Sequence, residues 1–306
     1  MKFFWAVIIF YLWFKLCVPS TIKEDFVSEN MYEWREVNMS DEIDDDFKIE
    51  IWKHEAPSDV SYMEDQYVDE DEYARSFQNI CITNQTFCDK VLFNWSYSIK
   101  DKYIYLASAI YILRFIENNI QIGLPIKKQL NVIVVNDYSN TRRGYANWDT
   151  ITLNLWSVSS YAEFMELISH EMWHIVDLWM VRWYSLQKDY EYTEFWQVVF
   201  SSDDPSLSYY AISWDSESIR KAWSTVADFC SSYAMSDPFE DFAECHNLYL
   251  NHNAIFKVWA QNNIALKQKY NFFANLYGGK YLFDTKSDLG TYANMVSVRP
   301  WDTTKM

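Results

Sequence analysis

The 306-residue sequence predicts an α+β fold in which a small sheet is followed by a mostly helical C-terminal part. Three observations support this class. A long run without Gly or Pro near residue 100 is typical of a helix, and two β-branched runs shortly after it are typical of strands. Most of the remaining chain has the pattern of helices, and half of all residues are apolar, which is enough for a packed core.

The sheet is expected between two long helices. The first helix covers residues 98–119, SIKDKYIYLASAIYILRFIENN, and ends before the breaker at residues 123–125, Gly-Leu-Pro. The β-branched run QLNVIVVND, residues 129–137, predicts a buried strand. Residues 145–155, YANWDTITLNL, predict a turn followed by an alternating strand.

The second long helix is expected to run to about Trp183 and to begin at Ser159 or Ser160, either of which can cap it. Glu163 follows Ser160 by three residues, which completes a capping box. NLYGGKY ends the last helix of the chain. Further helices are predicted at residues 190–200, 216–231, 238–252 and 254–276.

The N-terminal 20 residues, MKFFWAVIIFYLWFKLCVPS, resemble a secretory signal peptide. Lys2 precedes an apolar run that is shorter than the about 20 residues of a membrane span. An uncleaved anchor is the alternative, and any membrane contact is then expected only through this segment. A lipid-modified Cys17 fits less well, because no small residue precedes it. We therefore expect an exported protein, either secreted or held at the cell surface.

Residues 21–76 form an acidic segment, and within it residues 24–74 contain 19 Asp and Glu residues against only three basic residues. Residues 24–74 therefore carry nearly all of the net charge of −17, and the rest of the chain is close to neutral. Such a density of charge predicts a disordered spacer or pro-segment. No basic surface is present, so nucleic acid is not an expected partner.

Besides Cys17, the chain has four cysteines: Cys81, Cys88, Cys230 and Cys245. An even number in an exported chain predicts disulfides, with three possible pairings. Cys81 and Cys88 flank the polar sequence CITNQTFC and are expected to pair with each other. Four buried free thiols are the alternative.

The chain has 15 Trp and only 5 Gly, whereas average usage predicts roughly 20 Gly in a chain of this length. Trp148 lies between two strand-like runs and Trp301 lies in Arg-Pro-Trp-Asp, and at both turn-like positions Gly fits better. One hypothesis is that some Trp codons are UGA, which the source organism reads as Gly. The alternative is an unusually aromatic protein.

ELISHEMWHIVDLWM, residues 166–180, places His170 and His174 four residues apart on the expected helix. Residues at this spacing share one helix face, so both imidazoles can bind one ion, and Glu171 borders that face. His-Glu-x-x-His is the pattern of zinc hydrolases, in which a glutamate takes a proton from metal-bound water. The alternative is a helix with two hydrogen-bonded histidines.

A third metal ligand is expected from SSYAMSDPFEDFAECHNLYL, residues 231–250. Asp237 can cap a helix that has Pro238 at its first position. Glu240 and Glu244 then lie one turn apart on the same face, so Glu240 can bind the metal while Glu244 supplies a hydrogen bond behind it. The alternative for both acids is a favourable charge at a helix N-terminus.

The two blocks HEMWHIVD and SYAMSDPFEDFAE resemble the gluzincin metallopeptidases, and within them the catalytic domain of anthrax lethal factor and its bacterial relatives. The resemblance is specific only in these blocks, although the order of elements agrees over roughly residues 100–252. It implies a bacterial protein with a zincin-like fold and an active-site helix. It also implies Glu171 as general base, Tyr233 as oxyanion donor, and one Zn²⁺ ion bound by His170, His174 and Glu240.

Two residues depart from the family pattern: Asp241 stands where a second aromatic residue is common, and Trp173 stands where Gly is common. Asp177 either orients a ligand histidine or is a surface acid.

The expected function is a zinc-dependent endopeptidase acting on a protein or peptide, which adds as an extended strand to the edge strand DTITLNL. The first alternative is a catalytically silent zinc-binding module of an exported toxin-like or surface protein. The second is a structural protein whose acidic arm contacts a cationic partner.

Overall fold

A computed structural model describes residues 70–94, 97–121, 129–137, 142–183, 188–194, 198–202, 204–284, 289–292, 295 and 298–306. All of them belong to one compact unit, residues 38–306. The expected signal segment 1–20 and most of the acidic segment lie outside the described residues. The first described helix begins at Glu70, inside the segment expected to be disordered up to residue 76.

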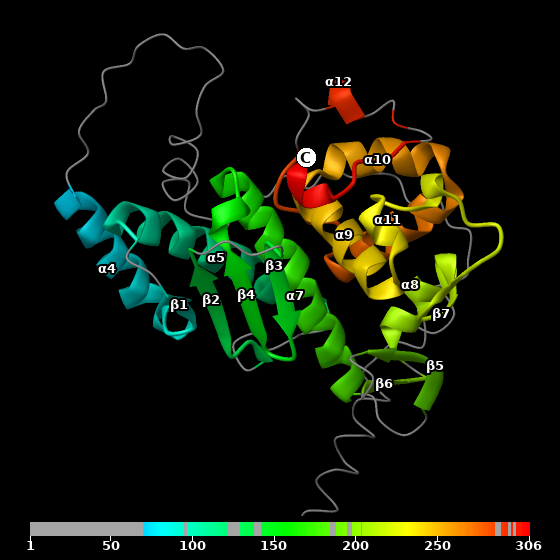
Figure 1. The fold of residues 1–306 in the computed structure, drawn as a ribbon, viewed down its shortest axis with the longest axis horizontal. Coiled ribbons are helices and arrows are strands. Elements are labelled where there is room, and N and C mark those ends of the chain that lie inside the picture. Colours follow the sequence, from blue (N-terminus) through cyan, green and yellow to red (C-terminus); the bar gives the residue numbers. More distant parts are fainter. Residues whose placement is uncertain are drawn as a thin grey trace, which may run out of the picture. The chain divides into compact units, whose positions relative to one another are not determined.

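The fold is α+β with a small mixed sheet, as the sequence predicts (Figure 1). The elements up to the central helix are α4 (Glu70–Cys88), β1 (Val91–Phe93), α5 (Ile99–Asn119), β2 (Val132–Asn136), β3 (Gly144–Asn147), β4 (Thr150–Asn154), η1 (Leu155–Ser157) and α7 (Tyr161–Trp183). The later elements are β5 (Lys188–Glu194), β6 (Val198–Ser201), α8 (Pro205–Ser213), β7 (Trp214–Ser216), β8 (Ile219–Arg220), η2 (Val226–Asp228), η3 (Tyr233–Met235), α9 (Pro238–Asn251), α10 (Asn253–Asn262), α11 (Ile264–Leu276), α12 (Leu289–Tyr292) and η5 (Thr303–Lys305).

The main sheet has the strand order β1-β2-β4-β3. β2 runs parallel to both β1 and β4, whereas β3 is antiparallel to β4 and opposes Thr152 with Tyr145. The expectation that DTITLNL forms the edge is wrong, because β4 pairs with a strand on each side and is buried at four of its five positions. The edge on this side of the described sheet is β3, whose residues are half-buried or exposed.

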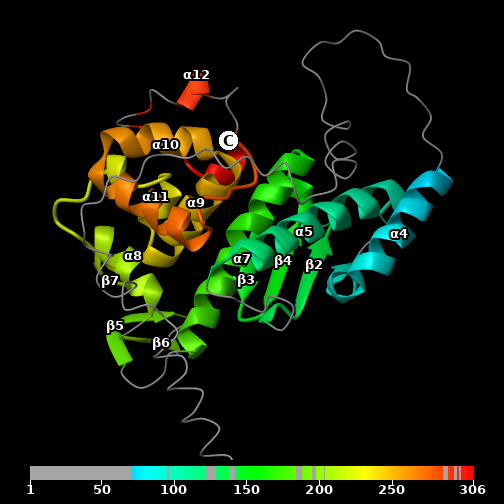
Figure 2. The same ribbon diagram turned by 180° about the vertical axis from the view of Figure 1, so that it is seen from behind.

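Helix α7 connects the sheet to the helical part of the molecule. It contacts β3 and β4 on one side and α9 on the other (Figure 1). α5 covers one face of the sheet and contacts both α4 and α7 (Figure 2). A helix between two layers must be apolar on more than one face, and Phe164 and Trp173, nine residues apart and so on opposite faces of α7, are both fully buried. None of the described helices has the length and hydropathy that a membrane crossing would need.

Side chains cap three helix starts, and the sequence predicts two of these caps, at Ser160 and Asp237. The Ser98 side chain accepts a hydrogen bond from the Asp101 amide at α5. At α7, Ser160 Oγ accepts from the Glu163 amide at 3.1 Å, and the Glu163 carboxylate accepts from the Ser159 amide at 2.7 Å. At α9, Asp237 accepts from the Glu240 amide at 2.8 Å, with Pro at the first helical position. These side chains satisfy amides that a helix start leaves without partners.

Two predicted helices are wrong. Residues 190–194 and 198–200 lie in the strand pair β5–β6, because this stretch is rich in Tyr, Thr, Phe and Val, which favour strands. Residues 216–231 contain the end of the β7–β8 hairpin and a single 3-10 turn, η2. Thr225 and Asp228 form a capping box there, but it starts only that turn. The helix predicted over residues 254–276 is divided at Asn263, which caps α11 by accepting from the Leu266 amide.

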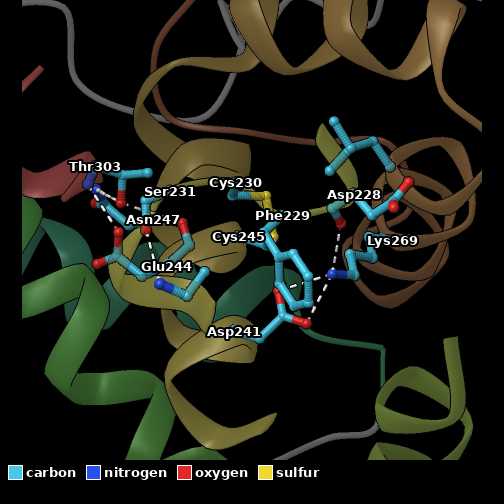
Figure 3. The surroundings of a disulfide bond; sticks show 12 residues. Asp228, Phe229, Cys230, Ser231, Asp241, Glu244, Cys245, Asn247, Lys269 and Thr303 are labelled. Atoms are coloured by element: carbon cyan, nitrogen blue, oxygen red, sulfur yellow. Dashed lines mark hydrogen bonds and ion pairs between the residues drawn. A yellow bond between two sulfur atoms is a disulfide. The ribbon is translucent and has the colours of Figure 1, made fainter. Parts of the chain in front are cut away.

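Two disulfides occur in the described residues, Cys81–Cys88 and Cys230–Cys245. Cys81 and Cys88 lie within α4 rather than on either side of a loop. A straight helix would separate residues seven apart by about 10 Å, but α4 is interrupted at Asn84 and the two Cα atoms are 5.6 Å apart. Cys230–Cys245 is buried and joins the segment before η3 to α9 (Figure 3).

A buried ion pair anchors α9 to α11. Lys269 Nζ lies 2.7 Å and 2.8 Å from the two carboxylate oxygens of Asp241 and donates to the Asp228 carbonyl at 2.8 Å (Figure 3). Trp214 Nε1 donates to the same carboxylate at 3.0 Å. Asp241, which departs from the family pattern, therefore has a structural role in the protein core.

The described tryptophans differ in how well their surroundings suit an indole ring. Trp214 and Trp259 donate their indole N–H groups to the Asp241 carboxylate and the Tyr292 carbonyl. Trp173 is fully buried with its ring 4.3 Å from that of His246, but its N–H has no hydrogen-bond partner in the described structure. Trp148 is the one described non-Gly residue with a positive φ, 57°. It occupies the first turn position of the β3–β4 hairpin, where Gly is favoured, so the UGA hypothesis remains open and is strongest at Trp148.

We predict that Trp148→Gly stabilises the protein by about 1 kcal/mol, because only Gly adopts left-handed backbone angles without a steric cost. Urea unfolding of the variant and the parent protein measures the difference. The control is Trp156→Gly, since Trp156 is more exposed, at 68 %, and does not have a positive φ. That substitution should leave stability unchanged or lower it.

A lower stability of Trp148→Gly would show that the indole contributes more than the backbone strain costs. Peptide mass spectrometry of protein from the native organism tests the codon hypothesis directly. Gly at position 148 supports it, and Trp at both 148 and 173 ends it.

Candidate metal centre

His170, His174 and Glu240 converge from two packed helices. The histidines lie one turn apart on α7, and Glu240 lies in the first turn of α9, which contacts α7. The Nε2 atoms of His170 and His174 are 3.2 Å and 3.7 Å from Glu240 Oε2. One ligand atom from each residue lies within 4.8 Å of the other two, so the three side chains could bind a single ion.

The donor set fits a cation. Glu240 Oε2 is buried, and no donor in the described part of the chain is aligned with it for a hydrogen bond. A buried carboxylate oxygen without a hydrogen bond is costly, and an ion between it and the two imidazoles would satisfy all three groups. Two imidazoles and one carboxylate, with a fourth position open, form a ligand set typical of catalytic zinc.

The pKa values of these groups show that the site favours positive charge. Burial lowers the pKa values of both histidines, but the nearby Glu240 carboxylate raises them by more. The pKa of His174 is therefore raised to about 9, and that of His170 well above its ordinary value. Burial raises the pKa of Glu240, but the two histidines outweigh this and hold it far below its usual range. A metal bound here would displace protons from both imidazoles.

Glu244 lies behind His170, as the sequence predicts for a residue that orients a ligand. Its side chain is fully buried, and Oε1 lies 3.0 Å from His170 Nδ1, although the two atoms are not aligned for a linear hydrogen bond. Glu244 Oε2 accepts a hydrogen bond from the Thr303 amide at 2.8 Å. The carboxylate therefore connects His170 to a segment distant in the sequence.

Glu171 lies on the side of the centre that faces β3. Its carboxylate is buried and accepts a hydrogen bond from the Ala146 amide, and burial raises its pKa. A Cβ atom at Gly144 would lie only 2.6 Å from Glu171 Oε1. The absence of a side chain at Gly144 thus allows the edge strand to approach this carboxylate closely.

Tyr233 lies in η3, which contacts α9. Its hydroxyl lies 2.8 Å from Glu240 Oε1 and donates to it, and its ring centroid is 6.4 Å from that of His170. Burial and the nearby carboxylate of Glu240 raise the Tyr233 pKa, so the hydroxyl keeps its proton. Tyr233 is therefore a neutral hydrogen-bond donor beside the centre.

These side chains line one cavity of about 740 Å³. The sequence did not identify three other parts of its wall: residues 144–146 of β3, Arg143, and the segment 301–305. Arg143 pairs with Glu163 and Asp302. Residues this far apart in the sequence meet only through folding, and no local pattern marks them.

Asp177 is buried, so the reading as a surface acid is wrong. Its carboxylate accepts hydrogen bonds from the hydroxyls of Ser206 and Tyr210, and burial raises its pKa to about 6. These contacts join α7 to α8. In the described structure the bonds of Asp177 go to those hydroxyls rather than to His170 or His174.

The remaining histidines lie elsewhere. His252 Nε2 is 3.1 Å from a carboxylate oxygen of Glu166, and His54 lies outside the described residues. His246 is fully buried, with Nδ1 3.0 Å from the Ser169 carbonyl and Nε2 2.8 Å from the Tyr277 hydroxyl. Burial lowers the His246 pKa to about 3.

No protein-family model, curated protein or solved structure matches this chain. The residues and distances above are therefore the basis on which its function is inferred.

We predict that His246 makes the fold sensitive to acid. Its pKa is lowered to about 3 in the folded protein, whereas an unfolded histidine titrates near pH 6.5. The contribution of His246 to the free energy of unfolding is complete above about pH 6.5. It declines as the pH falls towards 3, because in this range only the unfolded chain binds the proton. The loss is about 1.4 kcal/mol per pH unit.

Urea unfolding of the parent and of His246→Gln between pH 7 and pH 4, both with excess chelator, measures this contribution. The variant is expected to be less stable at pH 7 but to have a shallower dependence on pH. Two parallel stability curves would contradict the prediction, since all other groups titrate in both proteins.

Proposed function

We propose that this protein is a zinc-dependent endopeptidase of the gluzincin type with a zincin-like fold. The observation that carries the proposal is the buried Glu240 Oε2 atom, which lies 3.2 Å and 3.7 Å from the Nε2 atoms of His170 and His174 without an aligned hydrogen bond. Glu171 and Tyr233 line the same cavity. A site that only bound zinc would need neither of them, which favours catalysis over a silent zinc-binding module.

His170, His174 and Glu240 would hold the zinc ion. When bound, the ion would polarise the substrate carbonyl and lower the pKa of a water molecule towards 7. Glu171 acts as the general base that accepts a proton from that water and passes it to the leaving nitrogen. Burial of Glu171 supports this role because it raises the carboxylate pKa towards neutrality.

Tyr233 acts as the oxyanion donor. Its single O–H donates to Glu240 in the described structure, so it contributes to catalysis when it turns to the oxygen of the substrate. An interaction made in the transition state and not in the ground state accelerates the reaction. One such donor is worth about 3 to 4 kcal/mol of barrier.

An extended peptide can add to the free side of β3. This strand is the edge of the described sheet, lines the cavity and contacts Glu171. Main-chain hydrogen bonds to an edge strand bind peptides with little regard to sequence. The substrate class is therefore a protein or peptide, and pairing with β3 would bring a peptide bond next to Glu171.

Export also belongs to the proposal. Two disulfides in the described part of the chain support an oxidising compartment.

The first test is Glu171→Gln. We expect the variant to bind zinc as the parent does but to lose peptide hydrolysis, because the amide cannot accept the proton. Tyr233→Phe should keep zinc and lower kcat by about 10²- to 10³-fold. Metal content and cleavage of an unfolded protein substrate measure both effects.

Retained hydrolysis in Glu171→Gln would overturn the assignment of the base. A parent protein that binds zinc but cleaves no substrate would favour the silent zinc-binding module.

The second test is Gly144→Ala. The added Cβ would lie 2.6 Å from Glu171 Oε1, so the carboxylate must move. Displacing a reacting group by about 1 Å can cost about 10²-fold in rate, so we expect kcat to fall to this extent at unchanged zinc affinity. Gly290→Ala is the matched control, because a Cβ there meets nothing within 4 Å. Equal activities of the two variants would contradict the prediction.

A further inference from the structure

The segment of residues 300–304 lies against three parts of the candidate centre. The Pro300 and Trp301 carbonyls accept hydrogen bonds from the Ser232 and Tyr233 amides, both at 2.8 Å. These contacts use only backbone atoms of residues 300 and 301, so they do not depend on whether position 301 is Trp or Gly. They hold the turn that carries the Tyr233 hydroxyl.

Thr303 binds α9 through three hydrogen bonds. Its amide donates to Glu244 Oε2 at 2.8 Å, and its hydroxyl donates to the Glu244 carbonyl at 3.2 Å. Asn247 Nδ2 donates to the Thr303 hydroxyl at 3.1 Å (Figure 3). Thr303 and Glu244 are both fully buried, so water cannot replace these contacts.

The same segment holds the start of the edge strand. Arg143, which precedes the first residue of β3, pairs with Asp302 and donates to the Thr304 hydroxyl at 2.9 Å. Asp302 in turn accepts from the Thr304 amide at 2.7 Å. Residues 300–304 thus contact the Tyr233 turn, α9 and Arg143, the residue that precedes β3.

The contact of Thr303 with Glu244 has a specific consequence for His170. A carboxylate has two oxygens and can rotate towards any available donor. The Thr303 amide is a fixed donor and occupies Oε2, which leaves Oε1 at 3.0 Å from His170 Nδ1. The partner of the second imidazole nitrogen sets the orientation and basicity of a ligand histidine.

We propose that Thr303 is a positioning residue of the zinc site, and that its backbone N–H fixes Glu244 so that Glu244 holds His170 ready to bind the metal. The inference rests on the proposed zinc site, but it concerns a residue that does not touch the metal or the substrate.

The test compares Thr303→Pro with Thr303→Ala. Both remove the hydroxyl, but only Pro removes the N–H. Thr303 is the first residue of η5 and follows Asp302, whose backbone is extended at φ −152° and ψ 129°. Both positions suit a proline.

Zinc affinity is measured by competition with a chromophoric chelator. We expect Thr303→Pro to bind zinc 10- to 100-fold more weakly than Thr303→Ala, the range found when a partner of a ligand histidine is lost. The visible spectrum of the Co²⁺-substituted proteins should differ between the two variants, because the orientation of His170 changes.

To distinguish positioning of Glu244 from a purely structural role of Thr303, the comparison of Thr303→Pro with Thr303→Ala is repeated in proteins that also carry Glu244→Gln. If Thr303 acts through the Glu244 carboxylate, the difference between Pro and Ala should fall to about twofold or less, since coupled residues are not additive. A difference of unchanged size would overturn the proposal, and so would equal zinc affinities of Thr303→Pro and Thr303→Ala.

If Thr303→Pro fails to fold, NMR of the parent protein supplies the answer. The amide resonance of Thr303 should shift on zinc binding, while that of Gly290 should not, and an unchanged Thr303 resonance would overturn the proposal. A parent protein that binds no zinc would instead refute the proposed function, and this inference with it.

Discussion

The half-buried carboxylate of Glu240 is the group on which the arrangement of the candidate centre depends. Its oxygens face the imidazoles of His170 and His174 on α7 and the hydroxyl of Tyr233 in η3. Its Oε2 atom is buried, and a buried carboxylate oxygen is tolerable only when donors or positive charge surround it. The positions of α7, α9 and η3 are therefore mutually constrained, and any cation at this place must fit between the same atoms.

Helix α9 carries two separate systems of charge. On one side Glu240 and Glu244 face the cavity, and on the other Asp241 pairs with Lys269 in the core. The core pair neutralises itself, and breaking such a pair costs about 3 to 5 kcal/mol. The centre instead depends on protons or a metal for positive charge. The Cys230–Cys245 disulfide spans the stretch that contains Tyr233 and both glutamates, and so limits how far this stretch can move.

The successes and failures of the sequence predictions have different physical origins. The caps at Ser160 and Asp237 were predictable because each side chain acts on an amide only three residues away. The strands within residues 190–200 were not predictable, since a short apolar run suits either a helix or a strand until its neighbours are known. The prediction of the edge strand was wrong for the same reason, because periodicity does not show which strands pair with β4.

The sequence by itself determined the local chemistry of the protein. Helical spacing places His170 and His174 on one face, and Asp237 starts the helix that carries Glu240. Only the tertiary structure decided what surrounds them. Thr303 reaches Glu244 across 59 positions of the chain, and Gly144 brings an edge strand against Glu171. Such contacts depend on how layers pack and where strands pair, and no pattern within a single segment encodes either.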